Sequence, residues 1–109
     1  MLSQDIFNKE IQSIMEQLIN VYAPEKVILF GSLAEGIVKE GTDIDLFIIK
    51  KDIPHLGVDR IRQLDSLIKY KLATDFIVYK PEEVRKRLEA DEPFVKSIME
   101  KGKVLYDGK

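Results

Sequence analysis

The sequence predicts an α+β fold in which helices pack on a small mixed β-sheet. Short β-branched apolar runs alternate with longer stretches of three- and four-residue apolar spacing, and no repeat or long linker divides them. At 109 residues the chain has room for one domain, and we expect residues 1–109 to form it. A hydrophobic content of 45% and a charged content of 33% are typical of a globular protein.

An amphipathic helix is expected at the N-terminus, from near Ser3 to before Pro24. Its apolar face consists of Ile6, Phe7, Ile11, Ile14, Met15, Leu18, Ile19 and Tyr22. The first strand is expected at Lys26–Phe30, because this run is rich in β-branched residues and ends at Gly31.

Between the first two strands, residues 33–35 are expected to begin a short helix that breaks within residues 36–41, which contain two glycines. The second strand, residues 43–49, has one wholly apolar face. Its other face begins with the carboxylates of Asp43 and Asp45, because side chains two apart in a strand share a face.

The second half is expected to alternate helices with strands. An apolar face over Val58–Leu72 predicts a second long helix, and residues 75–79, closed by Pro81, predict a third strand. Shorter elements complete the chain: helices over residues 82–90 and 93–100, and a strand over residues 104–106.

Charge and composition narrow the class of protein. The net charge of −2 gives no overall basic field for nucleic acid or membrane surfaces. Cysteine is absent, which excludes disulfides, thiolate metal sites and a cysteine nucleophile. The N-terminus lacks the basic and apolar regions of a signal peptide, and the longest apolar runs are too short to cross a membrane. We therefore expect a cytoplasmic protein.

The acidic pair is the first candidate for chemistry. In a strand the Cα atoms of Asp43 and Asp45 would lie roughly 6.5–7 Å apart on one face, and two such carboxylates repel unless a cation lies between them. Mg²⁺ prefers oxygen ligands of this kind. Asp75 opens the third strand in the same way. The plain alternative is a pair of surface acids that face water.

Gly31 and Ser32 are the complementary candidates, for binding phosphate. A strand that ends in Gly-Ser before a helix would present backbone N–H groups, a hydroxyl and the positive end of a helix dipole to an anion. Glycine would also let a phosphate approach the backbone closely.

With these motifs the sequence resembles the minimal nucleotidyltransferases of the DNA polymerase β superfamily. The resemblance runs through residues 30–36, 41–46 and 74–78 and covers essentially the whole chain. It implies that Asp43 and Asp45 bind two Mg²⁺ ions that hold ATP, and that Asp75 completes one metal site and helps to deprotonate the acceptor. It implies that Gly31 and Ser32 hold the triphosphate.

One residue departs from the family pattern. Where the family commonly has Gly-Ser-x-Ala-Arg-Gly, this chain has Glu35, so an anion replaces a cation near the phosphates. Lys39 is a substitute only if the short helix brings it to the same place.

The resemblance also implies a partner. Full-size members carry a further domain for the acceptor, and we expect none here. The chain resembles the stand-alone members of MNT type, which commonly pair with a small helical HEPN-type protein, act as the antitoxin of that pair and can transfer AMP to the partner. We therefore expect a hetero-oligomer that contacts nucleic acid only through its partner. The competing hypothesis is a non-catalytic protein that binds nucleotide or neutralises its partner by occlusion, and a third is RNA tailing by a complex.

The other notable residues are expected to have no catalytic role. Arg60 and Arg62 are assigned to the surface, although either could line a nucleotide site, and His55 to an exposed loop. The basic run at residues 85–87 is expected to be a solvated helix face, because acids surround it. The apolar residues at 94–106 are expected mainly to close the core, with a partner surface as the alternative.

Overall fold

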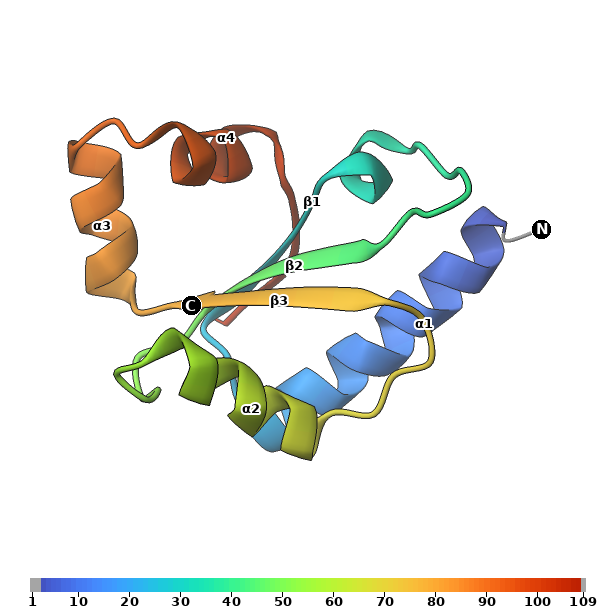
Figure 1. The fold of residues 1–109 in the computed structure, drawn as a ribbon, viewed down its shortest axis with the longest axis horizontal. Helices are drawn as coiled ribbons and strands as arrows, with labels where there is room; N and C mark the ends of the chain where they lie inside the picture. The colour runs from blue at the N-terminus through green and yellow to red at the C-terminus, as the bar shows by residue number, and fades with distance from the viewer. Residues whose placement is uncertain (1–2, 109) are drawn as a thin grey trace.

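The computed structural model describes residues 3–108, and it contains a four-stranded sheet between two pairs of helices (Figure 1). The strands are β1 (Lys26–Phe30), β2 (Ile44–Ile49), β3 (Thr74–Tyr79) and β4 (Lys103–Asp107), in the spatial order β3-β2-β1-β4. β1 is antiparallel to both of its neighbours, and β2 is parallel to β3. The mixed sheet confirms the predicted α+β fold.

Helices cover both faces of this sheet. Helices α1 (Gln4–Gln17) and α2 (Gly57–Leu67) lie on one side, and α3 (Pro81–Glu89) and α4 (Pro93–Lys101) lie on the other, as Figure 1 shows. A single 3₁₀ turn, η2 (Ser32–Glu35), follows β1. Among residues 3–108 no helix is long and apolar enough to cross a membrane.

The side-chain alternation of β2 separates two hydrophobic cores. Its even-numbered residues belong to the core beneath α1 and α2, which also contains Phe7, Ile14, Leu18 and Leu64. Phe47 and Ile49 belong to the core beneath α3 and α4, with Val84, Val95 and Ile98. The C-terminal segment therefore closes the core largely as predicted, although Phe94 remains 45% exposed. Odd-numbered positions of β2, including Asp45, face the side of α3 and α4.

Two predicted helices end differently in the structure. α1 continues as a π-helical turn, η1 (Leu18–Tyr22), and ends where Ala23 adopts a left-handed conformation with φ of 56°. The second helix stops at Leu67 instead of reaching Leu72. Ile68 follows in an extended conformation and is still buried, so it continues the apolar spacing without being helical.

The loop between α2 and β3 is held by polar side chains of α1. The Gln17 side-chain amide donates to the Lys69 carbonyl and accepts from the Lys69 N–H, each at 2.8 Å. The Glu10 carboxylate accepts from the backbone N–H groups of Lys71 and Leu72. Because these bonds fix the chain just before β3, they also fix the position of Asp75.

Arg60 corrects the prediction that both arginines of α2 lie on the surface. It is only 4% exposed, and its guanidinium forms two hydrogen bonds with the Glu83 carboxylate, at 2.8 and 3.1 Å. It also donates to the carbonyls of Pro54, His55 and Val78. Arg60 therefore ties α2, the preceding loop, β3 and α3 together, whereas the exposed guanidinium of Arg62 forms a salt bridge with Asp59, at 3.7 Å.

Candidate functional site

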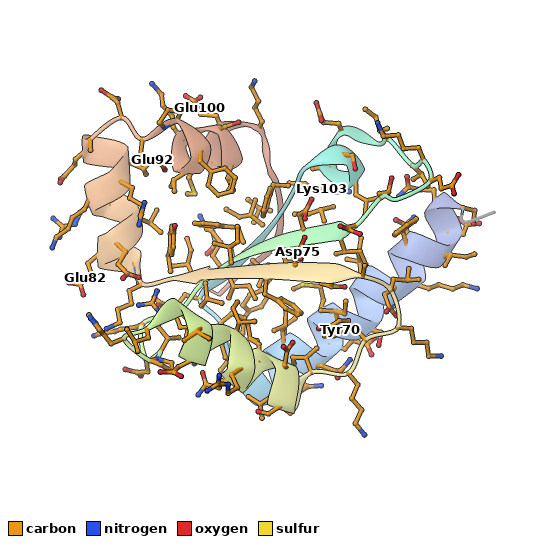
Figure 2. The ribbon with its side chains drawn as sticks, viewed as in Figure 1. Tyr70, Asp75, Glu82, Glu92, Glu100 and Lys103 are labelled. Carbon is orange, nitrogen blue, oxygen red and sulfur yellow. The ribbon has the colours of Figure 1, made fainter. Side chains whose placement is uncertain are left out.

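Strand register brings Asp45 and Asp75 side by side. Asp45 on β2, an inner strand, is the cross-strand partner of Phe30 on β1 and of Asp75 on β3. Residues paired in this way point to the same face, which here is the face of α3 and α4. Figure 2 shows Asp75 on that side of β3, whereas Tyr70 lies on the other side. Asp75 is exposed and Asp45 is half-buried.

The surroundings of Asp45 disfavour its negative charge. The pKa of its carboxyl is raised from 3.8 to about 6, first by burial and then by the negative charges of Asp75 and Asp43. When protonated, Asp45 can also share a hydrogen bond with Asp75. Within residues 3–108 no lysine or arginine forms a salt bridge with either carboxylate. The position is therefore one where a bound cation would stabilise the protein.

Asp43 lies just outside this pair. It is half-buried in the segment before β2, and its charge contributes to the raised pKa of Asp45. As the side chains stand, no three His, Cys, Asp or Glu residues among the described part of the chain are gathered closely enough to hold a metal ion. Asp45 and Asp75 fit a hard divalent cation by donor type and by their place on paired strands, and Asp43 would join them only by a change of side-chain rotamer.

Gly31 packs directly against the carboxylate of Asp45. Its φ of +77° is in the left-handed region, and a Cβ atom built on it would lie 2.4 Å from Asp45 Oδ2. Only glycine fits here, since any side chain would displace the carboxylate. The Gly-Ser turn therefore lies next to Asp45, as predicted.

The short helix predicted after Gly31 is a single 3₁₀ turn in the structure. Ser32 is half-buried and begins η2, which has four residues in a 3₁₀ turn, so it carries little of the dipole expected from a full helix. Phosphate binding at this turn would depend on the close backbone approach at Gly31, the Ser32 hydroxyl and the first N–H groups of the turn.

A pocket of about 290 Å³ opens beside Gly31, between η2 and α4. Its wall on the side of η2 includes Glu35, so this anion lies in the pocket next to Gly31. The wall on α4 includes Phe94, Ser97 and Lys101. These three residues are spaced by three and four positions and lie on one side of the helix. Lys39 is exposed and does not line this pocket.

Sequence reasoning missed Lys101 and Ser97 as candidate binding residues. The apolar residues around them predicted core closure, and a lone serine and a lone lysine in such a helix gave no separate signal for binding. Only the topology reveals their place, because α4 leads into β4, which pairs with β1 and brings the end of α4 next to Gly31.

Comparison with known proteins agrees with this arrangement. Residues 9–109 match the model of the family described as polymerase beta, nucleotidyltransferase. Two Methanocaldococcus jannaschii proteins, each named "putative protein adenylyltransferase", are 30% and 34% identical to the chain over 86 and 82 residues. The matches cover 74% and 75% of this chain, and 57% and 78% of those proteins. The chain thus spans little more than half of the first relative.

A solved structure is also similar. It is titled as a "putative nucleotidyltransferase" from Sulfolobus solfataricus, and it aligns with a TM-score of 0.60 and 27% identity over 76% of this chain and 75% of that one. The family match covers nearly the whole chain, and the fold agrees with it. The chain belongs to the polymerase beta nucleotidyltransferase family.

Proposed function

We propose that this protein transfers AMP from ATP to a protein, with divalent metal ions bound by Asp43, Asp45 and Asp75. The observation that carries the proposal is the pairing of Asp45 with Asp75 beside Gly31, where burial and neighbouring charge raise the pKa of Asp45 to about 6. A protein acceptor is supported by the names of the M. jannaschii relatives.

The three carboxylates have different roles in this proposal. Two Mg²⁺ ions, when bound, would stabilise the entering and leaving oxygens of an in-line displacement at the α-phosphorus. Asp43 and Asp45, both half-buried, would hold the two ions, and Asp75 would complete one of the metal sites. Asp75 is exposed, so an acceptor hydroxyl from another protein would meet it first.

The bond changes follow from this arrangement. The acceptor oxygen forms a bond to the α-phosphorus, the bond from that phosphorus to the pyrophosphate oxygen breaks, and the hydroxyl proton passes to Asp75. Gly31 and Ser32 would hold the phosphates in line with the attacking oxygen, and such positioning supplies much of the rate enhancement in phosphoryl-type transfer.

A small helical HEPN-type protein is the proposed acceptor, and the pair would form a toxin–antitoxin complex. The face with the acids supports an acceptor that arrives from outside. There α3 and α4 cover Phe47 and Ile49, whereas Asp75 remains exposed. An acceptor protein could therefore reach the acids without displacing a helix.

The test is incubation of the protein with its co-expressed HEPN-type partner, ATP and Mg²⁺, followed by intact-mass measurement. We expect a mass increase of one or more AMP groups on the partner. The increase should vanish in the Asp43→Asn/Asp45→Asn double variant. It should persist in Asp52→Asn, a control because Asp52 is an exposed acid beyond the opposite end of β2.

A second function is favoured by one observation, the presence of Glu35 in the pocket wall. An anion near the phosphates would weaken triphosphate binding, so the protein could neutralise its partner by occlusion alone. In that case the same experiment gives a tight complex with no mass change, and the double variant binds as well as the wild type. That result would exclude the transferase.

A further inference from the structure

The pocket between η2 and α4 lies next to the turn that packs against Asp45, although Asp45 and Asp75 are not among its lining residues. Gly31 belongs both to its lining and to the contact with Asp45 Oδ2. A triphosphate whose α-phosphate lay at Asp45 and Asp75 would reach the pocket by way of Gly31. The polar side chains of the pocket lining are those of Glu35, Ser97 and Lys101, and the other lining residues are glycines or apolar.

Of the residues that the structure describes, Lys101 is the one whose cationic side chain lines this pocket. It is the last residue of α4, it is exposed, and among residues 3–108 no carboxylate forms a salt bridge with it. Across the pocket lies Glu35, the residue found where the family pattern has an arginine. The cation is therefore present, but on the opposite wall.

We propose that this pocket binds the β- and γ-phosphates of the nucleoside triphosphate, with Lys101 supplying the positive charge that Glu35 does not. The inference rests on the proposed function, since it assumes that the α-phosphate lies at the carboxylates. The Ser97 hydroxyl, one helical turn before Lys101, is a second donor for the same phosphates. The pocket then selects triphosphates over monophosphates, because AMP does not extend into it.

The main experiment measures equilibrium binding by titration calorimetry with Mg²⁺, using ATP, AMP and inorganic tripolyphosphate as ligands. Lys101→Ala should weaken ATP and tripolyphosphate by about tenfold, since a charge-assisted phosphate contact is lost, and change AMP by less than about twofold. Lys103→Ala is the matched control. Lys103 pairs with Leu29, whose side chain lies in the core beneath α1 and α2, so it faces away from the pocket.

A charge-restoring variant sharpens the test. Glu35→Lys in the Lys101→Ala background should return ATP affinity to within about threefold of the wild type, because the cation is restored from the opposite wall. Failure of this second change to improve ATP binding would show that the two residues do not face the same phosphates, and the proposal would fall.

Other outcomes are equally decisive. If Lys101→Ala weakens ATP and AMP equally, its role is structural and the proposal is wrong. If it leaves tripolyphosphate unchanged while Phe94→Leu weakens AMP, the pocket holds the nucleoside and the proposal is wrong again.

Failure of the two proposals can be told apart. If the wild type transfers AMP but Lys101→Ala binds ATP like Lys103→Ala, only the pocket inference fails. If ATP and tripolyphosphate binding depend on Lys101 and no AMP is transferred, the proposed phosphate site is supported and the proposed AMP transfer is wrong.

Discussion

Two charged clusters of this protein stand in contrast. At one end of β3, the buried guanidinium of Arg60 meets the Glu83 carboxylate and three backbone carbonyls, and every hydrogen bond is 3.2 Å or shorter. At the other end, Asp45 and Asp75 lie together with no basic side chain of the described chain in salt-bridge contact. The charges of the first cluster are paired within the described part of the protein, whereas those of the second cluster are not.

Their pKa shifts have opposite signs for this reason. The pKa of Glu83 is lowered, chiefly by its hydrogen bond with Arg60. The pKa of Asp45 is raised, chiefly by burial and then by neighbouring carboxylates. A cluster whose charges are balanced internally stabilises a fold, whereas an unbalanced one at a fixed place in a sheet indicates a ligand that supplies the missing charge.

The largest effect on stability is expected from removing Arg60, which pairs with Glu83. Arg60→Met should lower the free energy of unfolding by about 3 kcal/mol, because it leaves three carbonyls and a carboxylate without their donor. That is a large share of the roughly 5–15 kcal/mol typical of a domain. Urea denaturation followed by circular dichroism measures it.

Arg62→Ala is the control for this prediction. Arg62 lies on the same helix and its side chain is 76% exposed, with one contact to Asp59 at 3.7 Å. The expected loss is within about 0.5 kcal/mol. Equal losses for the two variants would contradict the structural role assigned to Arg60.

A smaller effect on stability is expected from adding a side chain at Gly31, next to the carboxylate of Asp45. Gly31 and Gly36 both have φ of +77°, but a Cβ on Gly31 meets Asp45 Oδ2 whereas a Cβ on Gly36 meets nothing within 4 Å. Gly36→Ala should cost about 1 kcal/mol from backbone strain alone, and Gly31→Ala about 2 kcal/mol because the carboxylate must also move. Thermal unfolding of the two variants gives the difference.

A double-mutant cycle assigns that difference to Asp45. In an Asp45→Gly background the neighbouring carboxylate is gone, so Gly31→Ala should cost no more than Gly36→Ala does. If the excess cost of Gly31→Ala survives in that background, the contact between residues 31 and 45 is not its cause.

The sequence predicted elements better than it predicted the surroundings of side chains. β1 has the predicted bounds, Lys26–Phe30, because a β-branched run between Pro24 and Gly31 leaves little choice. The second helix was predicted too long because Ile68 is buried and continues the apolar spacing although it is extended. Burial and helical conformation are separate properties, and apolar periodicity reports only burial.

Some parts of the candidate site could be predicted from the sequence, and others depended on contacts between distant segments. Asp75 was expected at a strand end next to that of the acidic pair, and the register places it directly beside Asp45. The burial of Arg60 could not be predicted because Glu83, its partner, is 23 residues away in the chain. The place of Lys101 could not be predicted because Gly31 and Glu35, which line the same pocket, belong to a distant part of the sequence. Metal and phosphate ligation by Asp43, Asp45, Asp75, Gly31 and Ser32 stays a prediction.

The smallest expected effect is a pH dependence that separates the two clusters by sign. Because the folded-state pKa of Asp45 is raised, the folded protein binds more protons than the unfolded chain between pH 3.8 and about 6, and stability falls as the pH rises through this interval. Glu83 has a lowered pKa, so its contribution is present above its ordinary value of 4.5 and is lost as the pH falls below it.

Substitution of each acid isolates its part. Without metal, Asp45→Asn should be more stable than the wild type at neutral pH by up to about 1 kcal/mol, a value discounted because solvent screens a half-buried charge. The difference should vanish near pH 4 and shrink when Mg²⁺ is added, since the cation stabilises only the carboxylate. Glu83→Gln should instead lose stability at neutral pH and match the wild type in acid. If Asp45→Asn is less stable than the wild type at neutral pH without metal, the protein itself stabilises the negative charge of Asp45, as it does that of Glu83. That result would contradict the difference between the two clusters.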